Sequence, residues 1–115
     1  MLKSGAIQRI MYDSALTCSF ARYVIGDDGI PPLISAITGD LFTMNDFQEV
    51  GERVLNLERM FNVAEGITRK DDQLPRRLLE EPMFEGPNKG AVVPLEPLLD
   101  DAYLTLGWDK VTGIP

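Results

Sequence analysis

The sequence predicts an all-α fold, an irregular multi-helix bundle that forms a single domain over residues 1–115. Apolar residues recur at spacings of three and four in several segments, which is the period of a helix face. Residues that favour helix starts precede these segments, and glycines or prolines follow them. The only strand-like run, Ala91-Val92-Val93, is too short to make a sheet.

The first helix is expected over about residues 2–12. Its apolar face comprises Ala6, Ile7, Ile10 and Met11. Asp13 and Ser14 are both good N-cap residues, so a second helix is predicted to begin there and to run toward Val24. Cys18 then lies near the start of that helix, where the positive end of the helix dipole favours a thiolate.

A long helix shows the strongest pattern in the chain. Thr43 caps its start, and Asp46 stands at the third position of a capping-box-like arrangement. Its apolar face comprises Phe47, Val50, Val54, Leu57 and Phe61. Gly66 is a natural left-handed cap, so the helix is expected to end there.

Shorter helices are expected on both sides of this long one. They comprise residues 33–37, after the breaks at 26–29 and Pro31-Pro32 and before Gly39; residues 75–79; and a last helix that Pro94 opens and Gly107 closes. The charged run 68–73 joins two helices. Such a run is usually a solvated connector or a capping network, and it is not expected to touch substrate.

Composition excludes several classes of function. The net charge of −7 argues against non-specific nucleic-acid binding, which needs clustered Lys and Arg. The absence of histidine argues against zinc hydrolysis and against Ser–His or Cys–His pairs. We find no signal-peptide core and no apolar stretch near the roughly 20 residues that span a bilayer, so a cytoplasmic protein without membrane contact is expected.

Cys18 is the only cysteine, so the chain has no intrachain disulfide and no self-sufficient cluster site, since a four-iron cluster needs about four thiolates. A lone cysteine is most often a small buried side chain. The surrounding sequence changes this interpretation. The segment from Asp13 to Cys18 is accompanied, in order, by Thr38-Gly39, Gly51 to Arg59, Phe61-Asn62, Glu65-Gly66, Arg69 to Asp72, Leu74 to Arg77, Leu99-Asp100, Tyr103 and Gly107-Trp108-Asp109.

This string of motifs resembles the C-terminal domain of the tungsten-containing aldehyde:ferredoxin oxidoreductases, over about residues 7–115. The resemblance implies that Cys18 is the fourth ligand of an iron–sulfur cluster and that Asp13 accepts hydrogen bonds from the pterin. It also implies main-chain pterin contacts from Leu16 and Thr17. The family has Gly-Leu where this chain has Leu16-Thr17, and leucine does not adopt glycine's positive φ cheaply. No catalytic residue is implied.

The resemblance therefore implies a C-terminal domain or fragment of a larger enzyme. That enzyme oxidises aldehydes to carboxylic acids, passes electrons to ferredoxin, and holds a [4Fe–4S] cluster and a tungsten (or molybdenum) bis-pterin. The isolated chain is expected to be inactive and to hold neither group. Its expected partner is the remainder of the oxidoreductase, and a large apolar patch that faces this remainder is expected to drive self-association when exposed.

Two alternatives remain open from the sequence. One is a related tungsten reductase that acts on aromatic thioesters, whose catalytic subunit looks similar. The other is a cofactor-free helical interaction module, either a split subunit or a relic that docks on another protein.

Overall fold

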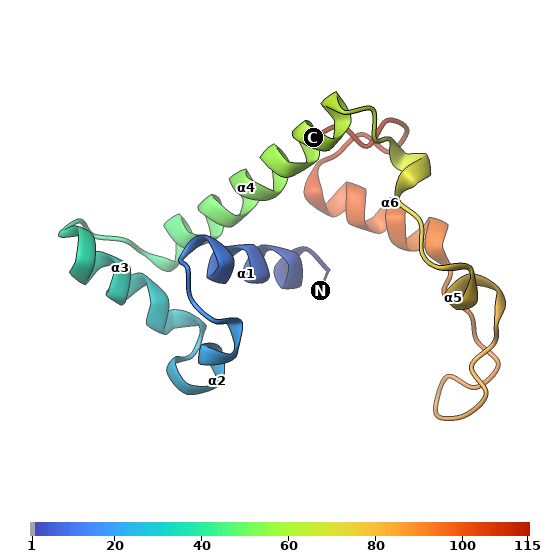
Figure 1. Ribbon diagram of the computed structural model, residues 1–115, viewed down its shortest axis with the longest axis horizontal. Helices are drawn as coiled ribbons and strands as arrows, with labels where there is room; N and C mark the ends of the chain where they lie inside the picture. Colours follow the sequence, from blue (N-terminus) through green and yellow to red (C-terminus); the bar gives the residue numbers. More distant parts are fainter. Residues whose placement is uncertain (1) are drawn as a thin grey trace. The chain divides into compact units, whose positions relative to one another are not determined.

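A computed structural model describes residues 2–115, with side chains from residue 5 onward. The described residues are helical or irregular and include no strand, which confirms the all-α class (Figure 1). The chain divides into two compact units, Met1–Arg59 and Met60–Pro115. The single domain over residues 1–115 stays a prediction. Among the described residues, no helix combines the length and the apolar character needed to cross a bilayer.

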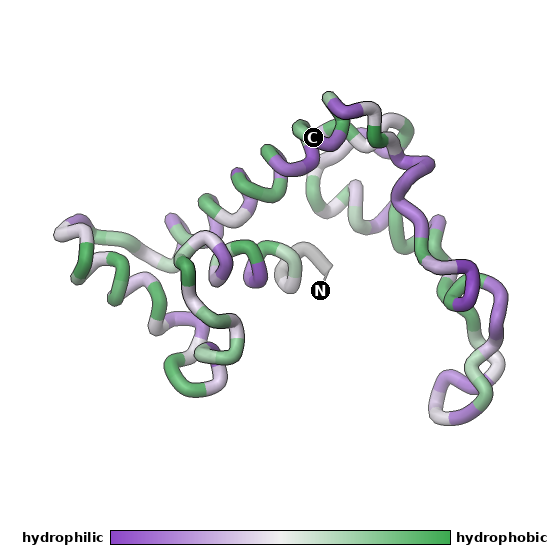
Figure 2. Tube along the Cα trace, viewed as in Figure 1, coloured by the Kyte–Doolittle hydropathy of each residue, from purple (hydrophilic) through white to green (hydrophobic). Residues whose placement is uncertain are grey.

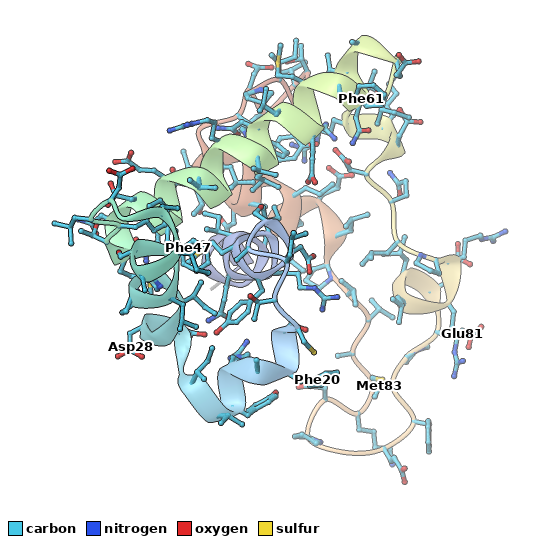
Figure 3. The ribbon with its side chains drawn as sticks, turned by 60° about the vertical axis from the view of Figure 1, so that its left-hand side comes forward. Phe20, Asp28, Phe47, Phe61, Glu81 and Met83 are labelled. Atoms are coloured by element: carbon cyan, nitrogen blue, oxygen red, sulfur yellow. The ribbon has the colours of Figure 1, made fainter. Side chains whose placement is uncertain are left out.

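The first unit is built from short helices around one small core. Its elements are α1 (Leu2–Ser14), the 3₁₀ helix η1 (Ser19–Ala21), α2 (Arg22–Ile25), the 3₁₀ helix η2 (Asp27–Gly29), α3 (Ile30–Thr38) and most of α4 (Met44–Ala64). The core comprises Ile7, Met11, Tyr12, Ile30 and Phe47. Figure 3 shows Phe47 of α4 beside α1.

Gly51 sets how closely α1 and α4 approach. A Cβ atom at this position would lie 2.8 Å from Ile7 Cγ2 and 2.9 Å from Met11 Cγ. Only a residue without a side chain therefore lets the two helices pack at this distance. The turn of α4 that carries Phe47 and Gly51 thus becomes its buried side, with Leu55 packed against the same core.

The ends of α4 agree with the prediction, but its buried face agrees only in part. The Thr43 N–H donates to Asp46 Oδ2 at 2.7 Å and the Asp46 N–H to Thr43 Oγ1 at 3.3 Å, which is the expected capping box. Leu57 and Phe61, by contrast, are exposed. Leu57 lies six residues after Gly51, so it is rotated by about 120° from the side that faces α1.

The predicted helix from Asp13 to Val24 is wrong. Helix α1 continues through Asp13 and Ser14, so these residues end a helix instead of capping a new one. A turn follows, and Cys18 stands before the three-residue helix η1 without a side-chain capping bond. The expected dipole of a long helix is therefore not present at the thiol, because dipole effects require several aligned turns.

The start of α3 also differs from the prediction. The helix begins at Ile30 instead of Leu33, so Pro31 and Pro32 lie in its first turn. Prolines are tolerated there because first-turn N–H groups have no helical partner. Gly39 ends the helix with a φ of 82°, as expected.

The second unit contains the 3₁₀ helix η3 (Arg69–Asp71), α5 (Arg76–Glu80) and α6 (Leu95–Leu106) after the end of α4. The run 68–73 is a capping network, as expected: the Thr68 N–H donates to Asp71 Oδ2 at 2.8 Å. Arg69 of η3 forms salt bridges with two residues of α6, Glu96 at 2.8 Å and Asp100 at 2.7 Å.

Tyr103 is the buried centre of α6. Its hydroxyl donates to Asp72, and the Arg69 guanidinium lies 5.2 Å from its ring centroid. The centroids of the Trp108 and Tyr103 rings lie 5.6 Å apart, so the two aromatic side chains pack against each other.

Candidate functional site

The candidate site is the turn that leads from α1 to Cys18. At this turn the Leu16 N–H donates to the Asp13 carbonyl at 3.1 Å and the Thr17 N–H to the Tyr12 carbonyl at 3.0 Å. These two bonds form a Schellman motif, whose left-handed residue is Leu16 with a φ of 54°. Leu16 is the only residue other than glycine with positive φ among the described residues.

Two other helices of the chain end with the same pair of hydrogen bonds. After α4 the Gly66 N–H donates to Val63 and the Ile67 N–H to Asn62; after α6 the Gly107 N–H donates to Leu104 and the Trp108 N–H to Tyr103. The left-handed residue is glycine in both, with φ values of 91° and 78°. The cap that precedes Cys18 therefore has the usual hydrogen bonds of a Schellman motif, but leucine instead of glycine occupies its left-handed position.

The predicted site residues of this turn differ in exposure and in hydrogen bonding. Asp13 is exposed, and one carboxylate oxygen lies 3.4 Å from Nε of Arg9, one helical turn earlier. Leu16 is 95% exposed. The Thr17 hydroxyl donates to the Ala15 carbonyl at 3.1 Å. Because the N–H groups of Leu16 and Thr17 are used by the cap, only their carbonyl groups remain for main-chain contacts with a ligand.

Cys18 is a free and exposed thiol. Its carbonyl accepts the Ala21 N–H at 2.8 Å, which holds η1 directly behind it. Among the described residues, no group of three or more His, Cys, Asp or Glu side chains is placed to hold a metal ion. The thiol is thus available as one ligand, and the other ligands of any cluster would have to come from outside this part of the chain.

An open hollow of about 300 Å³ lies next to this turn. Its lining comprises Gly5, Gln8, Arg9, Tyr12, Ser19, Phe20, Arg22 and Tyr23. An Arg22 guanidinium N–H donates to Gln8 Oε1 at 2.9 Å, and the Gln8 amide donates to Asp27. These bonds tie α2 and η2 to α1 and so fix the wall of the hollow beside Ser19, the residue after Cys18.

The Tyr12 hydroxyl closes the hollow on the side of the core. It donates to Asp27 Oδ1 at 3.0 Å and lies 3.2 Å from the Gly26 carbonyl. Burial raises the pKa of this phenol, and the hydrogen bond and negative charge of Asp27 raise the pKa further. Tyr12 therefore stays protonated and acts as a donor.

Sequence reasoning missed the residues around the hollow. Arg9 could have been found, because it lies four residues before Asp13 on a helix that extends through both. The contacts of Gln8 with Arg22 and Asp27 join residues 14 and 19 positions apart, and no local pattern marks them.

The comparisons with known proteins cover almost the whole chain. A sequence model of the family described as "Aldehyde ferredoxin oxidoreductase, domains 2 & 3" matches residues 1–115. The chain belongs to this family. It is 43% identical over 106 residues to the tungsten-containing aldehyde ferredoxin oxidoreductase of Pyrococcus furiosus, and 42% identical over 106 residues to those of Pyrococcus abyssi and Thermococcus kodakarensis.

These matches to aldehyde ferredoxin oxidoreductases cover 91% of the chain but only 18% of each relative. The chain thus corresponds to a small part of such an enzyme. Leu16 has the positive φ that glycine favours. The leucine occupies the left-handed position of the cap, and both hydrogen bonds of the Schellman motif are present.

Proposed function

We propose that this chain is part of a tungstopterin and iron–sulfur oxidoreductase that oxidises aldehydes to carboxylic acids with ferredoxin as electron acceptor. In this proposal Cys18 supplies one thiolate to a [4Fe–4S] cluster, and the remainder of the enzyme supplies the rest of the site. The observation that carries the proposal is the exposed, free Cys18 thiol in a chain that is 43% identical over 106 residues to a tungsten-containing relative.

The residues of the turn fit this role by their chemistry. A cluster of this type is held by about four thiolates, and a single exposed thiol is a suitable contribution from one segment. Asp13 presents an exposed carboxylate, which can accept hydrogen bonds from the N–H and amino groups of a pterin. Arg9 lies against this carboxylate and would compete with the pterin for the same oxygen.

The bound tungsten or molybdenum pterin and the cluster would supply the oxidation chemistry and the path for electrons. The chain would hold the cluster ligand and the pterin contacts in position. Its Schellman motif fixes the backbone from Tyr12 to Thr17, and the carbonyl groups of Leu16 and Thr17 are its free main-chain acceptors toward a pterin. A cytoplasmic location belongs to the proposal, because a free thiol suits a reducing compartment.

The decisive experiment replaces Cys18 in the assembled enzyme, purified anaerobically from its own host through a tag on this chain. We expect Cys18→Ala to lower the iron content by about four atoms per enzyme and to abolish aldehyde oxidation, since a cluster lacking a thiolate ligand is lost. Helix content by circular dichroism should not change, because the thiol is exposed and makes no capping hydrogen bond to η1.

Ser14→Ala is the matched control, because Ser14 is an exposed side chain at the end of α1 and has no proposed role. It should retain both iron and activity. Unchanged iron in Cys18→Ala would refute the ligand assignment. A chain that purifies alone, without iron, tungsten or molybdenum, would instead support a cofactor-free interaction module.

A further inference from the structure

Leu16 combines an unfavourable backbone conformation with an exposed apolar side chain. Its φ of 54° lies in the left-handed region, where a Cβ atom approaches the following carbonyl oxygen. Its side chain is 95% exposed, so no burial within the unit offsets this cost. The other two Schellman caps of the chain avoid the cost by using Gly66 and Gly107.

The residues that follow are also exposed and mostly apolar. Phe20, Tyr23 and Val24 have exposed fractions of 74%, 78% and 87%. The rings of Phe20 and Tyr23 stack with centroids 6.4 Å apart. Figure 2 shows hydrophobic residues along this stretch, and Figure 3 labels Phe20 on η1, outside the core that contains Phe47.

The stretch also carries little charge. Segment 16–24 carries Arg22 as its one charged residue, although a quarter of all residues are charged and the net charge is −7. An apolar, nearly uncharged segment suits burial against an apolar protein surface. The relatives extend far beyond the matched part, since the match covers 18% of their length, so most of a complete enzyme lies outside this chain.

We infer that Leu16 is a docking anchor, whose side chain inserts into an apolar surface of the remaining part of the oxidoreductase and holds the turn of Cys18 against it. The inference rests on the proposed function only in that the chain works within a larger enzyme. The backbone cost of Leu16 is then offset by burial that occurs only in the assembled enzyme, and strain that persists without local compensation marks a functional position.

The test compares one substitution in two contexts. In the isolated chain, at a concentration where it is monomeric, Leu16→Gly removes the strained Cβ and loses no packing. We expect the folding equilibrium constant from urea unfolding to rise about fivefold, which corresponds to about 1 kcal/mol. Gly66→Leu calibrates this cost, because it places leucine in the glycine cap of α4 and should lower the constant by a similar factor.

In the assembled enzyme the sign should reverse. There Leu16→Gly removes a buried side chain, so the enzyme should release or unfold this segment at a lower urea concentration than the unsubstituted enzyme. Hydrogen exchange of peptides that contain residues 13–20 should be faster by about tenfold or more, as for the loss of one buried leucine. Leu16→Ala separates the two effects, since it keeps the β-carbon strain but removes most of the side chain.

Leu16→Ala should leave the isolated chain almost unchanged and should weaken the assembled enzyme more than Leu16→Gly does, because it loses the buried side chain without relieving the backbone strain. Stabilisation by Leu16→Gly in both contexts would overturn the inference, and so would a chain that purifies without any further part of an oxidoreductase. Destabilisation of the isolated chain by Leu16→Gly would also overturn it, because Leu16 would then pack within this chain. Different measurements keep the two proposals distinct: iron content in Cys18→Ala tests the ligand role, whereas urea unfolding and hydrogen exchange of the Leu16 variants test the anchor.

Discussion

Tyr12 joins the core of the first unit to the candidate site through a single hydroxyl. Its ring is 1% exposed, while its hydroxyl donates to Asp27 on η2, directly after α2. A buried hydroxyl must find a partner, because an unsatisfied one loses its hydrogen bonds to water without replacement. Tyr12 thus holds the turn of Cys18 between the end of α1 and the next helices.

We predict that Tyr12→Phe lowers the free energy of unfolding by about 1 kcal/mol at neutral pH, the usual value of one net hydrogen bond. Because the pKa of Tyr12 is raised in the folded state, its contribution is complete below the ordinary tyrosine pKa near 10 and is lost as pH rises through the folded-state value. Urea unfolding of the unsubstituted chain and of Tyr12→Phe at pH 7 and above pH 10 measures the difference between their free energies of unfolding. This difference should be smaller at the higher pH.

Tyr23→Phe is the control for this prediction, since Tyr23 is an exposed tyrosine of the same unit. It should leave the stability at pH 7 unchanged, because its side chain is 78% exposed. Equal losses in both variants would mean that the buried hydrogen bond of Tyr12 contributes nothing specific.

The residue that closes α1 shows why this part of the site could not be derived from sequence. Asp13 and Ser14 satisfy the local rules for a helix start. The structure uses them to end a helix, because the left-handed conformation of Leu16 reverses the chain there. No local rule assigns leucine to that conformation, so propensity alone favours the wrong helix.

At the scale of elements, the helix boundaries predicted from the sequence agree with the structure where neighbouring residues determine them. The start of α4 and the end of α6 are set by neighbouring residues, namely the Thr43–Asp46 capping box and Gly107, and both were predicted. The buried face of α4 was predicted only in part, because it depends on where α1 packs. That contact is fixed by Gly51, a residue whose role appears only when both helices are in place.

Gly51 and Gly5 make a matched pair that tests this packing. Both lie inside helices, where glycine is usually worse than alanine by about 0.5–1 kcal/mol. A Cβ on Gly5 meets nothing within 4 Å, whereas one on Gly51 meets Ile7 and Met11 below 3 Å. We predict that Gly5→Ala stabilises the chain by about 0.5 kcal/mol and that Gly51→Ala destabilises it by about 1–3 kcal/mol through overpacking.

Urea unfolding of the two alanine variants measures both changes. Opposite signs are expected because the same substitution adds helix propensity at one site and a steric conflict at the other. Two stabilised variants would show that α1 and α4 can separate without cost, and the packing at Gly51 would then not determine the core.

At the scale of the whole molecule, the chain leaves many large apolar side chains in water. Val24, Ile37, Leu41 and Val111 are each more than 80% exposed, and Phe20 and Phe84 are about three-quarters exposed. Exposed apolar side chains therefore occur in each of the two units, and exposed apolar patches are typical of surfaces that another protein covers. It agrees with the small share of each relative that the chain represents.

We therefore predict that the isolated chain self-associates through these apolar residues. Static light scattering should give an average mass that rises above 12.8 kDa with concentration, and ammonium sulfate should increase it further because sulfate strengthens apolar association. Salt also screens the repulsion between copies of net charge −7, so sodium chloride at the same ionic strength separates this screening from the strengthening of apolar association.

Replacing both Phe20 and Val24 by serine should reduce the association. Leu104→Ser, at an exposed position on α6, should reduce it less. A mass that stays at the monomer value up to millimolar concentration would show that segment 16–24 does not bind itself, and would leave the surface of the parent enzyme as its only proposed occupant.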